Sequence, residues 1–169
     1  MQNRIDVVTD DQQLLELAAL AREIWQQHFV PIIGQDQVDY MLDKFQSVEA
    51  MKSQIESGYE YHLALRENEP AGYCAIMPNE PPKKLMLSKL YVRDSTRGTG
   101  LGSRLLNVAR QKAIDTEGSA IWLTVNRHNT QSIDWYKGRG FTVTDELKTD
   151  IGGGFYMDDY VMQLSVGPF

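Results

Sequence analysis

The chain has 169 residues, of which 42% are apolar and 24% charged, with 13 glycines and 6 prolines. This composition is typical of one globular domain that buries a sizeable core, and it argues against disorder. The 17 lysines and arginines against 23 aspartates and glutamates give a net charge of −6, which argues against a general nucleic-acid binder. An acidic surface favours small cationic partners instead.

Cysteine and histidine usage argues against a disulfide framework and against a metal site. Cys74 is the single cysteine, and His28, His62 and His128 are not at ligand spacing. The first residues lack the apolar stretch of a signal peptide, and no apolar run approaches the roughly 20 residues that span a bilayer. We therefore expect one domain over residues 1–169, cytoplasmic, with no metal, no nucleic acid and no membrane contact.

The first third of the chain is predicted to be mostly helical, after a short strand at residues 5–8. Hydrogen-bond acceptors at 9–11 are suited to capping a helix, and apolar residues then recur at helical spacing to about His28. The same spacing returns at 38–45 and at 48–55, where Ser47 is a suitable N-cap and Gly58 a stop.

Strands and helices alternate in the rest of the chain. Residues 61–65 and 72–77 flank a turn at 67–71 and predict a hairpin. Further strands are expected at 85–92, 120–125, 141–143 and 155–164, and helices from the glycine-rich segment at 97–102 to Gly118 and at 129–137. The pattern predicts a mixed α/β domain without repeats.

Three alternate glycines mark the junction between the strand at 85–92 and the helix that follows. Glycines at 98, 100 and 102 remove side chains where the backbone approaches a ligand, and the N–H groups of a helix start suit a phosphate or pyrophosphate. Arg97 adds a charged donor. The alternative is a tight strand-to-helix turn in which the glycines only permit positive φ.

Both common nucleotide motifs fail on spacing at this junction. A Walker A loop needs a lysine after its glycines, and none follows here. The dinucleotide fingerprint needs G-x-G-x-x-G and an acidic residue about 20 positions later, whereas the glycines here are spaced G-x-G-x-G.

Two segments together resemble a known family. The stretch Arg97-x-x-Gly100-x-Gly102 resembles the acetyl-CoA pyrophosphate loop of the GNAT superfamily of N-acetyltransferases. The segment from Asn129 through Ser132 and Tyr136 to Gly140-Phe141 is similar to that family's N-x-x-(A/S)-x-x-x-Y-x-x-x-G-F motif. The resemblance covers about residues 61–164.

The resemblance implies a GNAT fold: an α/β (α+β) domain with a mixed, mostly antiparallel sheet of six to seven strands and helices on both faces. Its strands 85–92 and 120–125 would run parallel and splay apart. It also implies acetyl-CoA as co-substrate and Tyr136 as the acid that protonates the leaving thiolate. The implied acetyl-CoA-binding residues are Leu90, Tyr91, Val92, Arg97, Gly98, Thr99, Gly100, Leu101, Gly102, Ser103, Asn129, Ser132 and Lys137.

The acceptor and the base stay open at this point. An alkylamine is mostly protonated at pH 7, so the site must supply a base or a water route. The candidates for the base are Glu60, His28, Asp158, Asp159 and water. The run 155–160 resembles the last strand of bacterial spermidine/diamine acetyltransferases, which implies a small polyamine or related amine as acceptor. The alternative for the two aspartates is an edge-strand charge pair that discourages aggregation.

Two further alternatives concern function. The acceptor could be a protein or peptide amino-terminus, and a domain of this kind could also bind CoA as a sensor without turnover. Cys74 sits in an apolar strand and is expected to be a small buried residue rather than a nucleophile, which favours direct attack in a ternary complex. The oligomeric state is open between a monomer and a homodimer.

Overall fold

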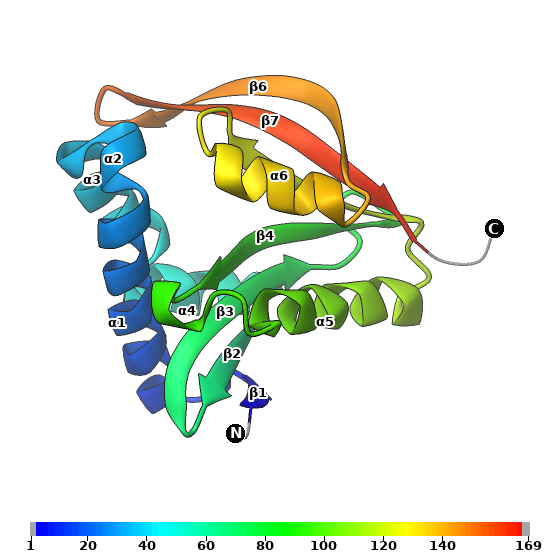
Figure 1. Ribbon diagram of the computed structural model, residues 1–169, viewed down its shortest axis with the longest axis horizontal. Helices are drawn as coiled ribbons and strands as arrows, with labels where there is room; N and C mark the ends of the chain where they lie inside the picture. The colour runs from blue at the N-terminus through cyan, green and yellow to red at the C-terminus, as the bar shows by residue number, and fades with distance from the viewer. Residues whose placement is uncertain (1–2, 167–169) are drawn as a thin grey trace. The chain divides into compact units, whose positions relative to one another are not determined.

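The structure is a computed structural model that describes residues 3–166. As predicted, its seven strands form a mixed, mostly antiparallel sheet, and their order is β1-β2-β3-β4-β5-β7-β6 (Figure 1). The elements are β1 (Asn3–Val7), α1 (Asp11–His28), α2 (Val30–Ile33), α3 (Gln35–Phe45), α4 (Val48–Glu56), β2 (Glu60–Arg66), β3 (Glu69–Met77), β4 (Lys84–Val92), a 3-10 turn (Asp94–Thr96), α5 (Leu101–Asp115), β5 (Ala120–Asn126), α6 (Thr130–Gly138), β6 (Thr142–Gly152) and β7 (Phe155–Ser165).

The described part of the chain divides into two compact units. Unit 1 consists of the residues up to 77 together with residues 89–108, and unit 2 consists of residues 78–88 and those from 109 onward. The first half of β4 and the second half of α5 thus belong to unit 2, and their other halves to unit 1. Each unit is described by itself.

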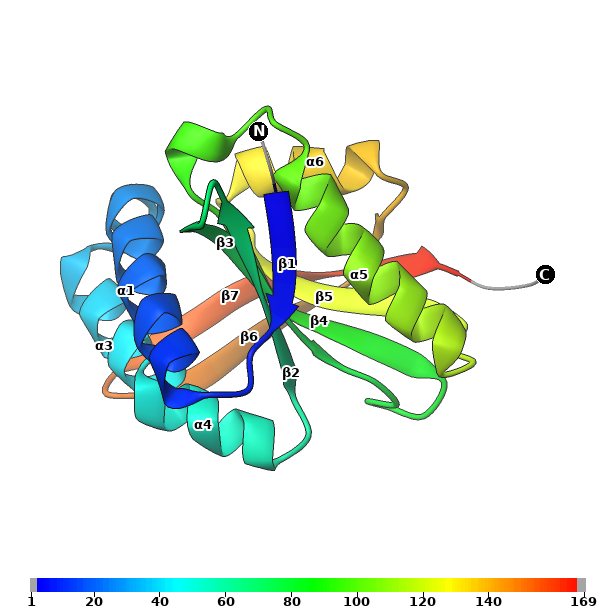
Figure 2. The ribbon, with the colours of Figure 1, turned by 90° about the horizontal axis from the view of Figure 1, so that it is seen from below.

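Unit 1 is built on the antiparallel strands β1, β2 and β3, with helices on both faces (Figure 2). Side chains of α1 and α4 form one core with those of β2 and β3 that point to the same face, including Tyr61, Leu63 and Tyr73. On the other face a Cβ at Gly72 would lie 3.3 Å from Leu105 of α5. The predicted N-caps are confirmed: Asp10 forms a capping box with Gln13, and Ser47 accepts from the backbone N–H of residue 50.

Two local features of unit 1 differ from the sequence prediction. The β2–β3 hairpin turn is formed by Glu67 and Asn68, with φ of +53° and +68°, so residues 69–71 belong to the strand instead of the turn. Such a two-residue turn matches the twist of the flanking strands. The short helix α2 was not predicted, because a single helical turn of four residues is too short to show periodicity.

Unit 2 contains the parallel pair that was expected. The pairing of β4 with β5 joins Lys84–Met86 to Ala120–Trp122. Strand β7 lies between β5 and β6 and is antiparallel to both.

The extent of β6 was predicted wrongly. Instead of residues 141–143, it is an eleven-residue strand whose first nine side chains are exposed. An edge strand that is exposed on both faces shows no apolar alternation, so the sequence gives no signal for it. The two aspartates of β7, in turn, do not lie on an edge strand.

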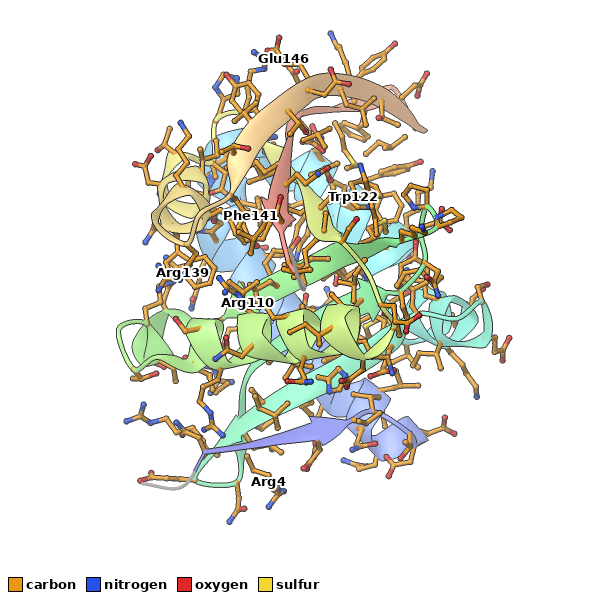
Figure 3. The ribbon with its side chains drawn as sticks, turned by 90° about the vertical axis from the view of Figure 1, so that its right-hand side faces the viewer. Arg4, Arg110, Trp122, Arg139, Phe141 and Glu146 are labelled. Carbon is orange, nitrogen blue, oxygen red and sulfur yellow. The ribbon has the colours of Figure 1, made fainter. Side chains whose placement is uncertain are left out.

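Helix α6 covers one face of the unit 2 sheet. The rings of Tyr136 and Phe141 lie 5.3 Å apart, and a Cβ at Gly140 would lie 3.2 Å from Leu164. Figure 3 shows Phe141 and Trp122 on either side of β7. Trp122, Thr124 and the other residues of that parity therefore lie on the face that α6 does not cover.

A buried lysine joins several elements of unit 1. Lys89 of β4 is 6% exposed. Its Nζ donates to the Phe45 carbonyl (2.5 Å), the Tyr61 hydroxyl (2.5 Å) and Gln54 Oε1 (3.1 Å). Phe45 ends α3, so its carbonyl has no acceptor role within the helix. Burial lowers the pKa of Lys89 to about 7.

This burial predicts a pH-dependent stability. Between pH 7 and 10.5 the unfolded chain binds more protons at Lys89 than the folded chain, so the stability contributed by this group rises with pH. We expect the unfolding temperature of the wild type to rise from pH 7 to pH 9 relative to Lys89→Met. The control is the exposed Lys52→Met, whose offset from the wild type should not change with pH. Parallel curves for Lys89→Met and the wild type would contradict this account.

Among the described residues, no helix is both long and apolar enough to cross a membrane.

Candidate acetyl-transfer site

In unit 1, the glycine-rich junction leads from β4 into α5 through an exposed loop. Gly98 and Gly100 have φ of +79° and +83°, and a Cβ at either position would meet no atom within 4 Å. The first helical hydrogen bond of α5 runs from Arg104 N to Gly100 O at 3.1 Å. The N–H groups of residues 101 and 102 therefore precede the helical ladder and have no acceptor within the helix. Leu101 anchors the helix start, because its side chain is buried.

This geometry fits a pyrophosphate. Open space over both glycines leaves the backbone accessible, while the first-turn N–H groups and the helix dipole favour an anion. Thr99 lies in the loop, and its hydroxyl donates to the Thr96 carbonyl (2.5 Å), which ties down the turn. Gly102 and Ser103 are half-buried on the first turn.

Arg97 is held beside the loop. Its Nη2 lies 3.2 Å from Asp94 and 3.4 Å from His28 Nδ1. His28 is the last residue of α1, and its ring packs edge-on against Phe29 at 4.8 Å. This candidate base therefore lies at a helix end beside an arginine.

The end of β4 is fixed by an aromatic cluster. Leu90, Tyr91 and Val92 are half-buried. The Tyr91 ring contacts Trp25 at 5.6 Å, Tyr73 at 5.4 Å and Phe29 at 5.9 Å. These contacts hold the strand segment to which the resemblance assigns pantetheine binding.

In unit 2, the second motif forms the start and one face of α6. Asn129 is the buried N-cap, and its side chain accepts from Ser132 N at 3.4 Å. The amide oxygen thus organises the helix start, one residue before the helix itself. Tyr136 is 8% exposed, with its ring against Trp135 (5.2 Å) and Phe141. Lys137 is exposed.

The two aspartates of β7 are on different faces. The Asp158 carboxylate pairs with Arg127 Nε at 3.0 Å, and Arg127 also pairs with Glu146 at 2.9 Å. Asp159 is 4% exposed. Burial, and after it the charge of Asp158, raises the pKa of Asp159 to about 6, while a hydrogen bond with Thr124 acts in the opposite direction.

Two further candidates have other roles. Glu60 Oε1 and His62 Nε2 are hydrogen-bonded at 2.7 Å. The partner of His62 thus lies two residues away, on the same face of the strand. Cys74 is fully buried, as predicted, and burial raises the pKa of its thiol to about 12. A thiol in this state does not form the thiolate that a covalent route requires.

Sequence reasoning missed two groups. One is the Lys89 network, since a single lysine in a strand gives no sign of its partners. The other links α5 to the end of α6: Arg110 Nη2 donates to the Arg139 carbonyl at 3.3 Å, and the Arg139 guanidinium stacks over Trp135 at 3.8 Å (Figure 3).

Comparisons with known proteins agree with this reading. The family model "Acetyltransferase (GNAT) family" matches residues 17–141, which is more than half of the chain. An uncharacterized N-acetyltransferase of Lactobacillus delbrueckii subsp. lactis is 27% identical over 143 residues, covering 80% of this chain and 83% of its own.

Two solved structures show the same fold. The PaiA N-acetyltransferase of Thermoplasma acidophilum, in complex with coenzyme A, has a TM-score of 0.81 at 21% identity and covers 98% of this chain and 99% of its own. The ribosomal-protein-S18-alanine N-acetyltransferase of Escherichia coli has a TM-score of 0.72 at 15% identity, with coverage of 99% and 96%.

The fold and the two motifs thus define an acyl-CoA-dependent transferase. The chain belongs to the GNAT family of acetyltransferases, and it is an N-acetyltransferase that uses acetyl-CoA.

Proposed function

We propose that this enzyme acetylates a primary amine of a small cationic molecule, a polyamine or a related amine. The observation that carries this acceptor class is the acidic β6–β7 hairpin, whose two strands contain five carboxylates and one lysine. Arg127 pairs with two of these carboxylates, and the hairpin keeps a net negative charge. Such a surface raises the local concentration of a cationic amine by long-range attraction. The resemblance of residues 155–160 to diamine acetyltransferases supports the same class.

We assign the acetyl donor to the residues that the motifs single out. The N–H groups at the start of α5, with Arg97, bind the pyrophosphate. Backbone groups of Leu90, Tyr91 and Val92 pair with the pantetheine like an added strand, and one of their N–H groups polarises the thioester carbonyl. Asn129 and Ser132 are assigned to the pantetheine arm, and Lys137 to the CoA phosphates.

The transfer is direct. The buried Cys74 thiol supports this route, because its raised pKa leaves it protonated and unreactive. Tyr136 gives a proton to the thiolate as it leaves.

An acceptor panel tests the proposal. Diamines and polyamines are compared with peptides that carry a free amino-terminus, and the release of CoA thiol is measured. We expect kcat/KM to be about tenfold or more higher for the polyamines, and to fall for them as ionic strength rises.

The other outcomes assign different functions. If peptides outcompete polyamines, the enzyme is a protein or peptide amino-terminal acetyltransferase; the S18-alanine enzyme of E. coli shows that this fold can serve such an acceptor. Thiol release no faster than background with every acceptor would leave a CoA-binding sensor.

A further inference from the structure

Asp159 is a buried acid whose charge no cation balances. Five other polar side chains are buried in the part of the chain that the structure describes, and each has a hydrogen-bond partner: Gln46, His62, Lys89, Thr96 and Asn129. Asp159 has a hydrogen bond with Thr124, but over residues 3–166 it forms no ion pair. Burying a carboxylate that only a hydroxyl group stabilises lowers the stability of the fold, and a functional role would account for such a residue.

Arg127, in the loop that follows β5, does not balance the charge of Asp159. In antiparallel strands, paired residues point to the same face, so Lys148 shares the face of Asp158 and Leu147 that of Asp159. Arg127 pairs with Asp158 and Glu146 and stacks over Tyr160, all on the face opposite to Asp159.

The charged groups on the face of Asp159 do not balance it either. On β6 this face carries Asp145, which is opposite Val161 and adds a negative charge. On β4 it carries Lys84, whose Nζ is bound to Gln163 Oε1 at 3.1 Å, four residues along β7 from Asp159. On β5 the facing side chains are uncharged: Trp122, Thr124 and Asn126.

Asp159 lies beside the carboxyl end of β5, a position that suits chemistry. Asp159 pairs with Asn126, the last residue of β5, just before the loop to the Asn129 cap of α6. Ligands of sheets with parallel strands gather at the carboxyl ends of those strands. Helix α6, which carries Tyr136, packs on the opposite face of the same sheet.

We propose that Asp159 is the general base that takes the proton of the acceptor amine, an inference that rests on the proposed function. The carboxylate first receives the cationic amine, whose charge replaces the missing partner. Asp159 takes one proton from the bound ammonium group, which leaves a neutral amine with a free electron pair. As this nitrogen bonds to the acetyl carbon, the C–S bond breaks and its electron pair leaves on the CoA sulfur, which Tyr136 protonates. The nitrogen then loses its second proton to water, and Tyr136 regains a proton from water. Proton acceptor and proton donor thus act from opposite faces of the sheet.

The variant that tests this role is Asp159→Asn. Asparagine has the same shape and keeps an acceptor for Thr124, but it takes no proton. We expect kcat/KM for the amine to fall about 10²-fold at pH 7.5, and the rise of kcat/KM near pH 6 to disappear, because that rise reports the ionisation of Asp159. The acetyl-CoA Kd, measured by calorimetry, should stay unchanged.

Asp115→Asn is the matched control, since it removes an exposed carboxylate of unit 2 at the end of α5, outside the β6–β7 hairpin. It should keep kcat/KM within about twofold and retain the rise near pH 6. If Asp159→Asn behaves like this control while the wild type acetylates amines, the assignment of Asp159 is overturned and the proposed function stands. If the wild type releases no thiol with any amine, both the function and the base assignment are overturned.

Thermal unfolding gives a readout that does not depend on turnover. The folded pKa of Asp159 is raised above its unfolded value of 3.8. The contribution of this group to the stability of the fold therefore falls as pH rises from about 4 to 6 and is lowest at pH 8. Asp159→Asn should therefore unfold at the same temperature as the wild type near pH 4 and at a higher one at pH 8. A lower unfolding temperature at pH 8 would show a structural carboxylate and overturn the proposal.

Discussion

Gly100→Val should abolish acetyl-CoA binding while the domain stays folded. Gly100 has φ of +83°, where a β-branched residue is strained by about 1–3 kcal/mol. Its side chain would also stand on the exposed loop where we expect the pyrophosphate to meet the backbone. Because the Cβ meets nothing within 4 Å, the substitution lowers the free energy of unfolding through backbone strain alone. A domain stability of about 5–15 kcal/mol exceeds this loss, so the variant stays folded.

Gly154→Val separates the effect of backbone strain from the effect of blocked access to the pyrophosphate site. Gly154 has the same φ of +83° and equally open surroundings, but it lies in the turn between β6 and β7. Calorimetric titration with acetyl-CoA, alongside thermal unfolding, should show similar losses of stability for both variants and a loss of binding for Gly100→Val alone. If Gly100→Val keeps its affinity for acetyl-CoA, the loop is only a turn.

Much of the fold was predictable because burial leaves a period in the sequence. Helix α1 presents one buried face, so its apolar residues repeat at 3.6. Strands β2 and β3 are buried on both faces, so they stand out as short, nearly continuous apolar runs between turn residues. Strand β6 is exposed almost throughout, so no alternation marked it. The single turn α2 is too short to repeat at all.

In the candidate site, too, some features could be predicted from the sequence and others could not. The backbone of the glycine-rich junction was predictable, because glycine is the residue type that the positive φ at 98 and 100 demands. Asn129 was expected inside the helix 129–137, whereas it is the N-cap of α6. Adjacent residues of a strand point to opposite faces, so one of the two adjacent aspartates of β7 must point inward. Which of them does so depends on the register between β5, β6 and β7, and that register places Asp159 inside and Asp158 beside Arg127.

Tyr136→Phe should lower kcat by about 10²-fold and leave the acetyl-CoA Kd unchanged. Phenylalanine preserves the ring that packs against Trp135 and Phe141, so the variant should fold like the wild type and lose the hydroxyl alone. A thiol with a pKa of about 8.5 can leave as the thiolate without help, so measurable activity should remain.

A second hydroxyl in the same unit supplies the control. Tyr156 of β7 is 51% exposed, and Tyr156→Phe should keep both kcat and Kd. Single-turnover release of CoA thiol, measured at saturating acetyl-CoA and amine, separates the chemical step from product release. A Tyr136→Phe enzyme with the kcat and single-turnover rate of the wild type would remove the acid role from Tyr136 and leave its ring as a packing element of α6. Loss of acetyl-CoA affinity with an unchanged kcat would instead make the hydroxyl a binding group, because a proton given only as the C–S bond breaks cannot contribute to ground-state affinity.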